Sequence, residues 1–290
     1  MPDKSQIHLR RLCFTAVLVA IAVTMRVFFT ISIPLQGEDG MRIGFAGVFS
    51  SLPAFLFGPL WGAISSGATD VLGHFLRPQG AYLPHITAVA VAAGFLRGGG
   101  WLLLKKRGNG LARVVLIGSA LVLLFGAVNW IIFRVDGVTA DIYMGTDTSD
   151  MFFISRWAIN RSAVAQNPMS VLQGAITAVT LTPFVAGILG LVLYVVSRVM
   201  NHFLHKENNE IPTIMPLLIA MLVAAWFQST MNTIILRQYV FSSWQLLPFW
   251  MVWFPRIFQT TITTVVHVYF VALLMNVCKR QKHVLPYLRS

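Results

Sequence analysis

Eight apolar segments, most of them long enough to cross a lipid bilayer, dominate this sequence of 290 residues. A membrane-spanning helix needs about 20 mainly apolar residues. The second and third segments are short and are separated only by the Gly58-Pro59-Leu60-Trp61-Gly62 turn, which predicts a tight helical hairpin or a broken helix. We expect an all-α integral membrane protein with about eight spans, at residues 12–33, 44–58, 60–76, 86–104, 112–133, 170–198, 213–235 and 249–278.

Composition excludes several other classes. Hydrophobic residues make up 56% of the chain and charged residues 11%, against about 25% charged residues in a typical soluble domain. Disordered chains have low hydrophobicity, and a basic nucleic-acid-binding protein would carry a polar soluble domain that is absent here. The run at 12–33 is longer than the apolar region of a signal peptide, about 7–15 residues, and Arg26 interrupts it, so we expect a retained first helix.

The basic residues predict an orientation. With the N-terminus in the cytoplasm, strict alternation of the eight spans places every lysine on the cytoplasmic side, as the positive-inside rule requires. Both termini are then cytoplasmic, and most of the net charge of +12 is explained by topology rather than by a nucleic-acid partner. The cytoplasmic side holds Lys4, Arg10, Arg11, Lys105, Lys106, Arg107, Arg113, Arg198, Lys206, Lys279, Arg280, Lys282 and Arg289, and the outer side holds Arg42, Arg77, Arg134, Arg156, Arg161 and Arg237.

Three arginines, Arg26, Arg97 and Arg256, fall inside the predicted spans together with one acid, Asp70. An ionisable group at membrane depth costs about 2.5–3.5 kcal/mol on insertion scales, so each is a candidate functional residue. Arg97 precedes three glycines in the inner half of its span, where we expect a structural or interfacial role. Arg26 and Arg256 lie in outer halves, and guanidinium groups gathered there suit an anionic solute. Asp70 and His74 are four residues apart, on one helix face, where a hydrogen bond is possible.

Motifs of catalysis and of metal or nucleotide binding are absent. The sequence has no phosphate-binding G-x-x-x-x-G-K-[ST] loop, no G-x-S-x-G elbow and no H-E-x-x-H pair. Cys13 and Cys278 are isolated, and the seven histidines do not cluster. We therefore expect no enzyme activity, no cofactor and no metal site.

The stretch from Met41 to Ala93 carries the most specific pattern. It contains R-I-G-F, F-G-P-L-W-G and D-V-L-G-x-x-x-x-P-Q-G-A-Y in that order, after two alanines four residues apart, Ala16 and Ala20. Near the C-terminus, Met231-Asn232-Thr233 and Pro255-Arg256-Ile257 belong to the same pattern. Over about 1–106 and 213–280 the chain resembles the substrate-binding S components of energy-coupling factor (ECF) vitamin transporters, and most closely the folate-type members.

The resemblance implies a multi-pass subunit of the cell membrane that binds a vitamin-like solute. Such subunits associate with a transmembrane coupling protein and two ATPase subunits, and Ala16 and Ala20 would lie on the face that contacts the coupling protein. Family members have six helices and fewer than about 200 residues, so residues 107–212 are expected to be an inserted helix pair with an outer loop at 134–168. The bundle proper would then consist of 1–106 and 213–290. The loop has no calcium-site spacing, and it would cover the site or serve a partner.

The implied solute is folate or a related anionic pterin. Arg26, Arg77 and Arg256 would neutralise its carboxylates, and Asp70 would accept hydrogen bonds from the pterin ring. Gln79, Tyr82, Asn232 and Trp244 would supply hydrogen bonds and an aromatic wall, although interfacial aromatic residues also occur without any ligand. Two alternatives stay open: an S component for another vitamin or a queuosine-type precursor, and a membrane scaffold or enzyme outside transport.

Overall fold

The computed structural model describes residues 4–35, 38–78, 80–138, 149–163, 172, 176, 180–205, 214–245 and 249–280. The chain divides into two compact units, one formed by residues 1–108 and 200–290 and the other by residues 109–199. We call these unit 1 and unit 2 and describe each by itself.

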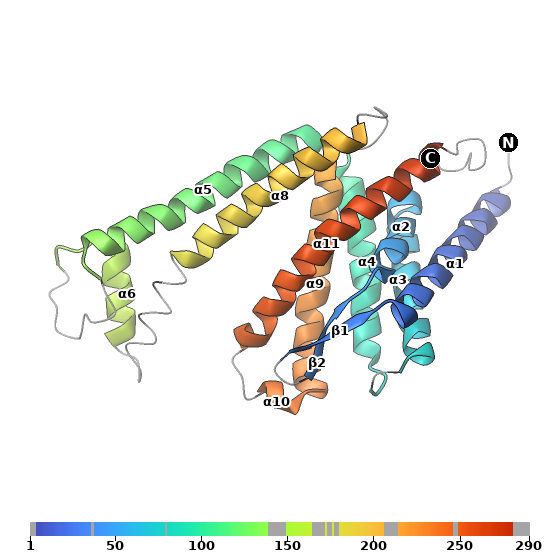
Figure 1. Ribbon diagram of the computed structural model, residues 1–290, viewed down its shortest axis with the longest axis horizontal. Coiled ribbons are helices and arrows are strands. Elements are labelled where there is room, and N and C mark those ends of the chain that lie inside the picture. Colours follow the sequence, from blue (N-terminus) through green and yellow to red (C-terminus); the bar gives the residue numbers. More distant parts are fainter. Residues whose placement is uncertain are drawn as a thin grey trace. The chain divides into compact units, whose positions relative to one another are not determined.

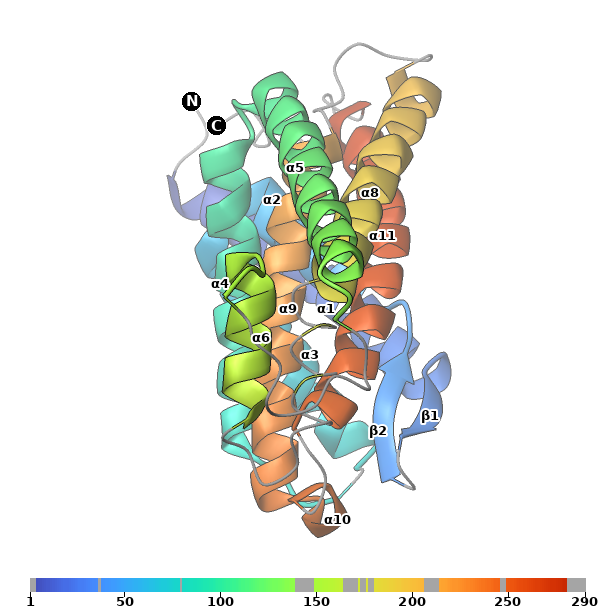
Figure 2. The ribbon, with the colours of Figure 1, turned by 90° about the vertical axis from the view of Figure 1, so that its left-hand side faces the viewer.

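Unit 1 is a helical bundle with one small hairpin (Figures 1 and 2). Helix α4 packs along α3 and α9, α11 packs against α9 and α2, and α1 packs against α2 and α3. The hairpin and α10 lie at one end of the unit, and the first turn of α1 and the last turn of α11 lie at the other end. Its elements are α1 (Lys4–Phe28), β1 (Ile31–Leu35), β2 (Glu38–Ile43), α2 (Ala46–Phe57), α3 (Pro59–Leu76), α4 (Pro84–Leu104), α9 (Ile214–Tyr239), α10 (Ser242–Gln245) and α11 (Phe249–Arg280).

The junction between α2 and α3 is the tight hairpin that the sequence predicts. Gly58 adopts φ 104°, a region that glycine enters without steric penalty, and Pro59 begins α3, where its missing N–H is not needed. One turn later, Gly62 lies against Ala54 and against the backbone carbonyl of Gly94 in α4. A side chain at either glycine would separate α3 from α4, so these small residues fix the close approach of the two helices.

The first helix ends earlier than expected. The apolar run was predicted to be helical as far as residue 33, but α1 ends at Phe28 and residues 31–35 form β1, which pairs antiparallel with β2. The alternation Ile-Ser-Ile-Pro-Leu fits a strand. Pro34 has no N–H to donate, and the register shifts between Ile33 and Leu35 at this point. This hairpin was not predicted.

Six helices of the described part of the chain are long and apolar enough to cross a membrane, which confirms an all-α membrane protein. Helix α2 has only 12 residues, and α3 carries Asp70 among several glycines and serines and is not one of the six. The count of eight spans and the cytoplasmic termini stay predictions. The six spans are Ser5–Phe28, Pro84–Leu104, Gly110–Val135, Leu181–Phe203, Ile214–Tyr239 and Phe249–Cys278.

Unit 2 consists of α5 (Gly108–Val135), α6 (Phe153–Ala163) and most of α8 (Leu181–His205). Helices α5 and α8 approach closely where Gly126 lies against the backbone of Phe184 and where Gly187 lies against Leu123. A small apolar core contains Phe133, Val138, Ala158, Ile159 and Leu172. The segment 134–168, predicted to be an outer loop, therefore contains the end of α5 and the helix α6, and residues 139–148 and 164–168 lie outside the described part of the chain.

Candidate functional site

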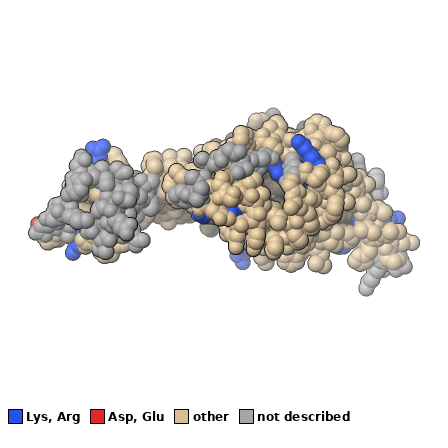
Figure 3. Space-filling view, turned by 90° about the horizontal axis from the view of Figure 1, so that it is seen from below, with Lys and Arg blue, Asp and Glu red and all other residues tan. Residues whose placement is uncertain are grey.

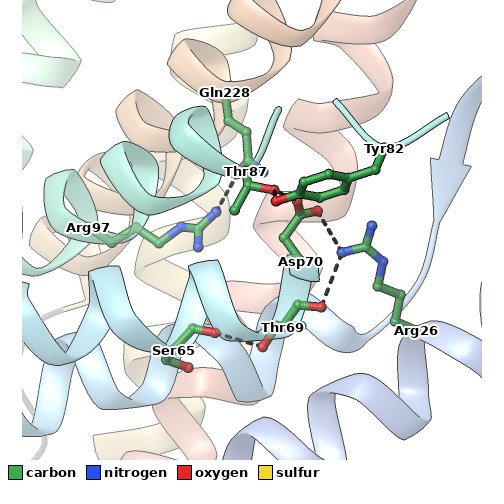
Figure 4. Close-up of polar contacts among 8 residues, drawn as sticks. All are labelled: Arg26, Ser65, Thr69, Asp70, Tyr82, Thr87, Arg97 and Gln228. Atoms are coloured by element: carbon green, nitrogen blue, oxygen red, sulfur yellow. Dashed lines mark hydrogen bonds and ion pairs between the residues drawn. The ribbon is translucent and has the colours of Figure 1, made fainter. Parts of the chain in front are cut away.

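Asp70 is the centre of a polar network that joins three helices of unit 1 (Figure 4). Its Oδ1 atom accepts a hydrogen bond of 2.8 Å from Arg26 Nη1, and its Oδ2 atom accepts one of 2.8 Å from the Thr87 hydroxyl. Arg26 also donates to the carbonyl of Thr69, and the Tyr82 hydroxyl lies 2.9 Å from that of Thr87. Residues from α1, α3 and α4 are thereby held together around a single carboxylate.

This network changes the roles expected for two site residues. Arg26 and Asp70 form an ion pair, with side chains 32% and 13% exposed, so each already compensates the charge of the other. The suggested hydrogen bond between Asp70 and His74 is not found. The His74 ring instead packs against Tyr82, with ring centroids 5.2 Å apart. The carboxylate is instead paired with Arg26, and charge-assisted hydrogen bonds of this kind are among the strongest in proteins.

A second polar layer lies further along α4. Arg97 Nη2 donates a hydrogen bond of 2.8 Å to Gln228 Oε1 on α9 (Figure 4). Arg97 Nη1 donates a longer one of 3.3 Å to the Ser66 hydroxyl on α3. Gln228 was not among the predicted site residues. It lies 131 positions away from Arg97 in the sequence, and no local pattern indicates that the two side chains meet.

Arg256 lies beside the hairpin and a buried tryptophan. Its Nη1 atom donates to the carbonyl of Gly40 in β2, and its guanidinium lies 5.7 Å from the centroid of the Trp244 ring. Trp244 is fully buried, and a Cβ at Gly40 would lie 2.5 Å from the Trp244 ring. Glycine at position 40 thus allows β2, α10 and α11 to meet at one point, with the arginine between them.

Side chains of α11 cover one edge of the hairpin. Arg256 donates to the carbonyl of Gly40, Gln259 Nε2 donates to the carbonyl of Arg42 at 2.9 Å, and His267 Nε2 lies 3.0 Å from the carbonyl of Gly44. The carbonyls of alternate residues point to the same edge of a strand. Polar α11 side chains therefore satisfy two carbonyls of β2, those of Gly40 and Arg42, that a third strand would otherwise pair, and His267 contacts the carbonyl just beyond the strand.

Three of the predicted site residues carry a buried polar atom without a hydrogen-bond partner among the described residues. These atoms are Asn232 Oδ1 on α9, Trp244 Nε1 on α10 and Arg256 Nε on α11. Buried polar groups are nearly always paired, and leaving one unpaired costs about 1–3 kcal/mol. Unpaired atoms of both kinds, one acceptor and two donors, are what a site for a polar solute would present.

The remaining predicted residues lie near the hairpin end of unit 1. Arg77 is exposed and donates a 2.7 Å hydrogen bond to the carbonyl of Val27, and Tyr82 is 39% exposed. Gln79 lies outside the described residues. Seen from this end, the coloured surface of unit 1 shows Lys and Arg atoms and no Asp or Glu atoms (Figure 3).

Ala16 and Ala20 lie on the exposed face of α1. The opposite face, which includes Leu18, Val19 and Ala22, is buried inside unit 1. The two alanines are therefore not needed for packing within the bundle, and the exposed face that they share is smooth enough for another helix to approach closely.

Comparisons with known proteins agree with the fold class and the sequence pattern. Residues 6–188 match the model of a family described as ECF-type riboflavin transporter, S component. Over 80 residues the chain is 32% identical to a protein of Clostridium novyi (strain NT) named Folate transporter FolT, and this alignment covers 28% of the present chain and 46% of that protein. The chain thus spans about half the length of this curated relative. No solved structure matches.

Proposed function

This chain belongs to the ECF-type riboflavin transporter S component family, and we propose that it is the substrate-binding membrane subunit of an ECF-type importer for folate or a related anionic pterin. Membership makes it a multi-pass protein of the cell membrane and a transport subunit rather than an enzyme. The solute, the energy source and the individual binding residues belong to the proposal.

The arrangement around Arg256 carries the proposal. A planar guanidinium pairs best with a carboxylate through two parallel N–H donors. Nη1 is engaged with Gly40, whereas Nε is a buried donor without a partner among the described residues, which a bound carboxylate would satisfy. The indole N–H of Trp244 and the amide oxygen of Asn232 provide one further donor and one further acceptor. These groups suit a solute that combines a carboxylate with a polar ring.

Charge favours a folate-like solute over riboflavin. Riboflavin is uncharged at neutral pH, whereas folates carry carboxylates, and the relative in Clostridium novyi is named as a folate transporter. Among the described residues, the ion pair joins Arg26 to Asp70. Neither Arg256 nor Arg77 is paired with a described carboxylate. In this proposal Arg256 binds a carboxylate of the solute, and Arg77 adds positive charge near the entrance. Arg26 and Asp70 form a neutral pair beside the solute, and Tyr82 and Gln79 lie near the entrance.

Binding measurements on the purified protein test the solute. We expect folic acid to bind with a dissociation constant below about 1 μM and riboflavin to bind at least tenfold more weakly, a difference of about 1.4 kcal/mol. Arg256→Ala should weaken folic acid binding more than tenfold, whereas Arg107→Gln, which removes an exposed arginine beyond the end of α4, should not. Tight riboflavin binding, or no binding of any folate, would overturn the folate assignment. A wider panel that includes a queuosine-type precursor would then identify the solute.

The exposed alanine face of α1 is the proposed contact surface for the partner subunits. We propose that Ala16 and Ala20 contact a transmembrane coupling protein, which in turn associates with two ATPase subunits that supply the energy. An Ala16→Trp/Ala20→Trp double variant should bind the solute normally but should not co-purify with these subunits. Leu103→Trp, which places a tryptophan at an exposed position of α4, should co-purify as the wild type does. Equal recovery with both variants would show that another surface is used.

A further inference from the structure

Arg97 is a charged side chain between membrane-spanning helices, and the structure gives it neutral neighbours only. Its hydrogen bonds go to an amide oxygen and a hydroxyl, and no described carboxylate forms an ion pair with it. Asp70 lies on α3 one turn beyond Ser66, but its two oxygens are engaged with Arg26 and Thr87. An unpaired charge at low dielectric is costly, and arginines that persist in such places usually serve a function.

The two hydrogen bonds of Arg97 orient its guanidinium but do not compensate its charge. Gln228 and Ser66 approach the guanidinium from α9 and α3, and they fix its orientation without neutralising it. A purely structural arginine would be expected to pair with a carboxylate or to reach a helix end, where carbonyl groups are free. Arg97 does neither within the described part of the chain, because it lies in the interior of α4 and of its span.

Arg97 lies deeper in the bundle than the other candidate cations. At a rise of 1.5 Å per residue it is about 20 Å along α4 from Pro84, whereas Arg256 is about 10 Å along α11 from Phe249. Both helices begin at the hairpin end of unit 1 (Figure 1). Asn232, with its unpaired oxygen, lies one turn from Gln228 on α9, toward the hairpin end. Polar groups thus continue from the level of Arg256 to the level of Arg97.

We propose that Arg97 is a second anion-binding residue of the same site, and that the solute carries two anionic groups, the inner one bound by Arg97 and the outer one by Arg256. This inference rests on the proposed function and adds the number and depth of the charged groups. Gln228 acts as a positioning residue, because it holds the guanidinium of Arg97 by the shorter of the two hydrogen bonds.

Arg97→Gln tests this proposal through two measurements, with Arg107→Gln as the matched loss of an exposed arginine. The first is the unfolding temperature without solute. If Arg97 has no internal counter-charge, the variant unfolds at the same temperature as the wild type or a higher one. The second is binding of folic acid, which has two carboxylates, and of pteroic acid, which has one. We expect the variant to lose at least tenfold in affinity for folic acid and less than threefold for pteroic acid.

Two results would overturn the assignment of Arg97 while leaving the proposed function intact. One is a lower unfolding temperature in Arg97→Gln than in both the wild type and Arg107→Gln, which indicates a structural role. The other is an unchanged ratio of folic acid to pteroic acid affinity. If the wild type binds neither compound, the proposed function fails in its folate form, and the assignment of Arg97 to a folate carboxylate fails with it.

Discussion

Asp70→Asn should destabilise unit 1, because the carboxylate holds α1, α3 and α4 together. Its two oxygens accept bonds of 2.8 Å from Arg26 and from Thr87. Hydrogen bonds to a charged group contribute about 1.5–3 kcal/mol each, and removal of one partner from a fully buried ion pair costs about 3–5 kcal/mol. Asn keeps an acceptor oxygen, and Arg26 is 32% exposed, so we expect a loss of about 1–3 kcal/mol in the free energy of unfolding.

A double-mutant cycle separates the ion pair from other effects of each substitution. Asp70→Asn, Arg26→Gln and the double variant are compared by denaturant-induced unfolding in detergent, with Thr87→Val as a control that removes only the neutral donor. The coupling energy should be about 1–2 kcal/mol, above the value of about 0.2–1 kcal/mol measured for exposed pairs. A coupling energy below about 0.5 kcal/mol would refute the claim that this pair joins α1 to α3.

Three further predictions concern other parts of unit 1. Arg256→Ala should weaken binding of folic acid more than tenfold in a titration, and an unchanged affinity would remove this residue from the site. The Ala16→Trp/Ala20→Trp variant should lose its coupling partner in a pull-down while keeping its solute, and loss of both would indicate misfolding instead. Gly94→Val should lower the free energy of unfolding by about 1–3 kcal/mol, because its side chain would collide with a backbone carbonyl of α3. Gly99→Ala, whose Cβ would meet nothing within 4 Å, is the control and should be neutral or stabilising.

The sequence predicts most of the helices because lipid imposes a simple requirement on a spanning segment, namely length and low polarity. It does not predict the β1–β2 hairpin. Residues 31–33 continue the apolar run of α1, and hydropathy alone does not distinguish a strand from the last turn of a helix. The edge of β2 is satisfied by Arg256 and Gln259, which lie more than 200 positions away in the chain, so no local signal indicates a strand there.

The candidate site was predictable in part. Ionisable residues inside apolar segments are rare, so Arg26, Asp70 and Arg256 are conspicuous in the sequence. Which of them pair with one another depends on contacts between distant helices. The Arg26–Asp70 pair and the Arg97–Gln228 bond are such contacts. In the structure Asp70 compensates the charge of Arg26, whereas Arg97 donates to the neutral amide of Gln228. The roles of the eight predicted binding residues stay predictions until binding is measured.

Mass spectrometry of small molecules that remain bound through purification tests whether this chain binds an anionic solute through Arg256. An anionic compound with a pterin-like ring should be enriched with the wild-type protein and lost from Arg256→Ala, while Arg107→Gln should retain it. Enrichment of an uncharged compound, or equal retention of the same compound by Arg256→Ala and the wild type, would contradict the claim that this chain binds an anionic solute through Arg256.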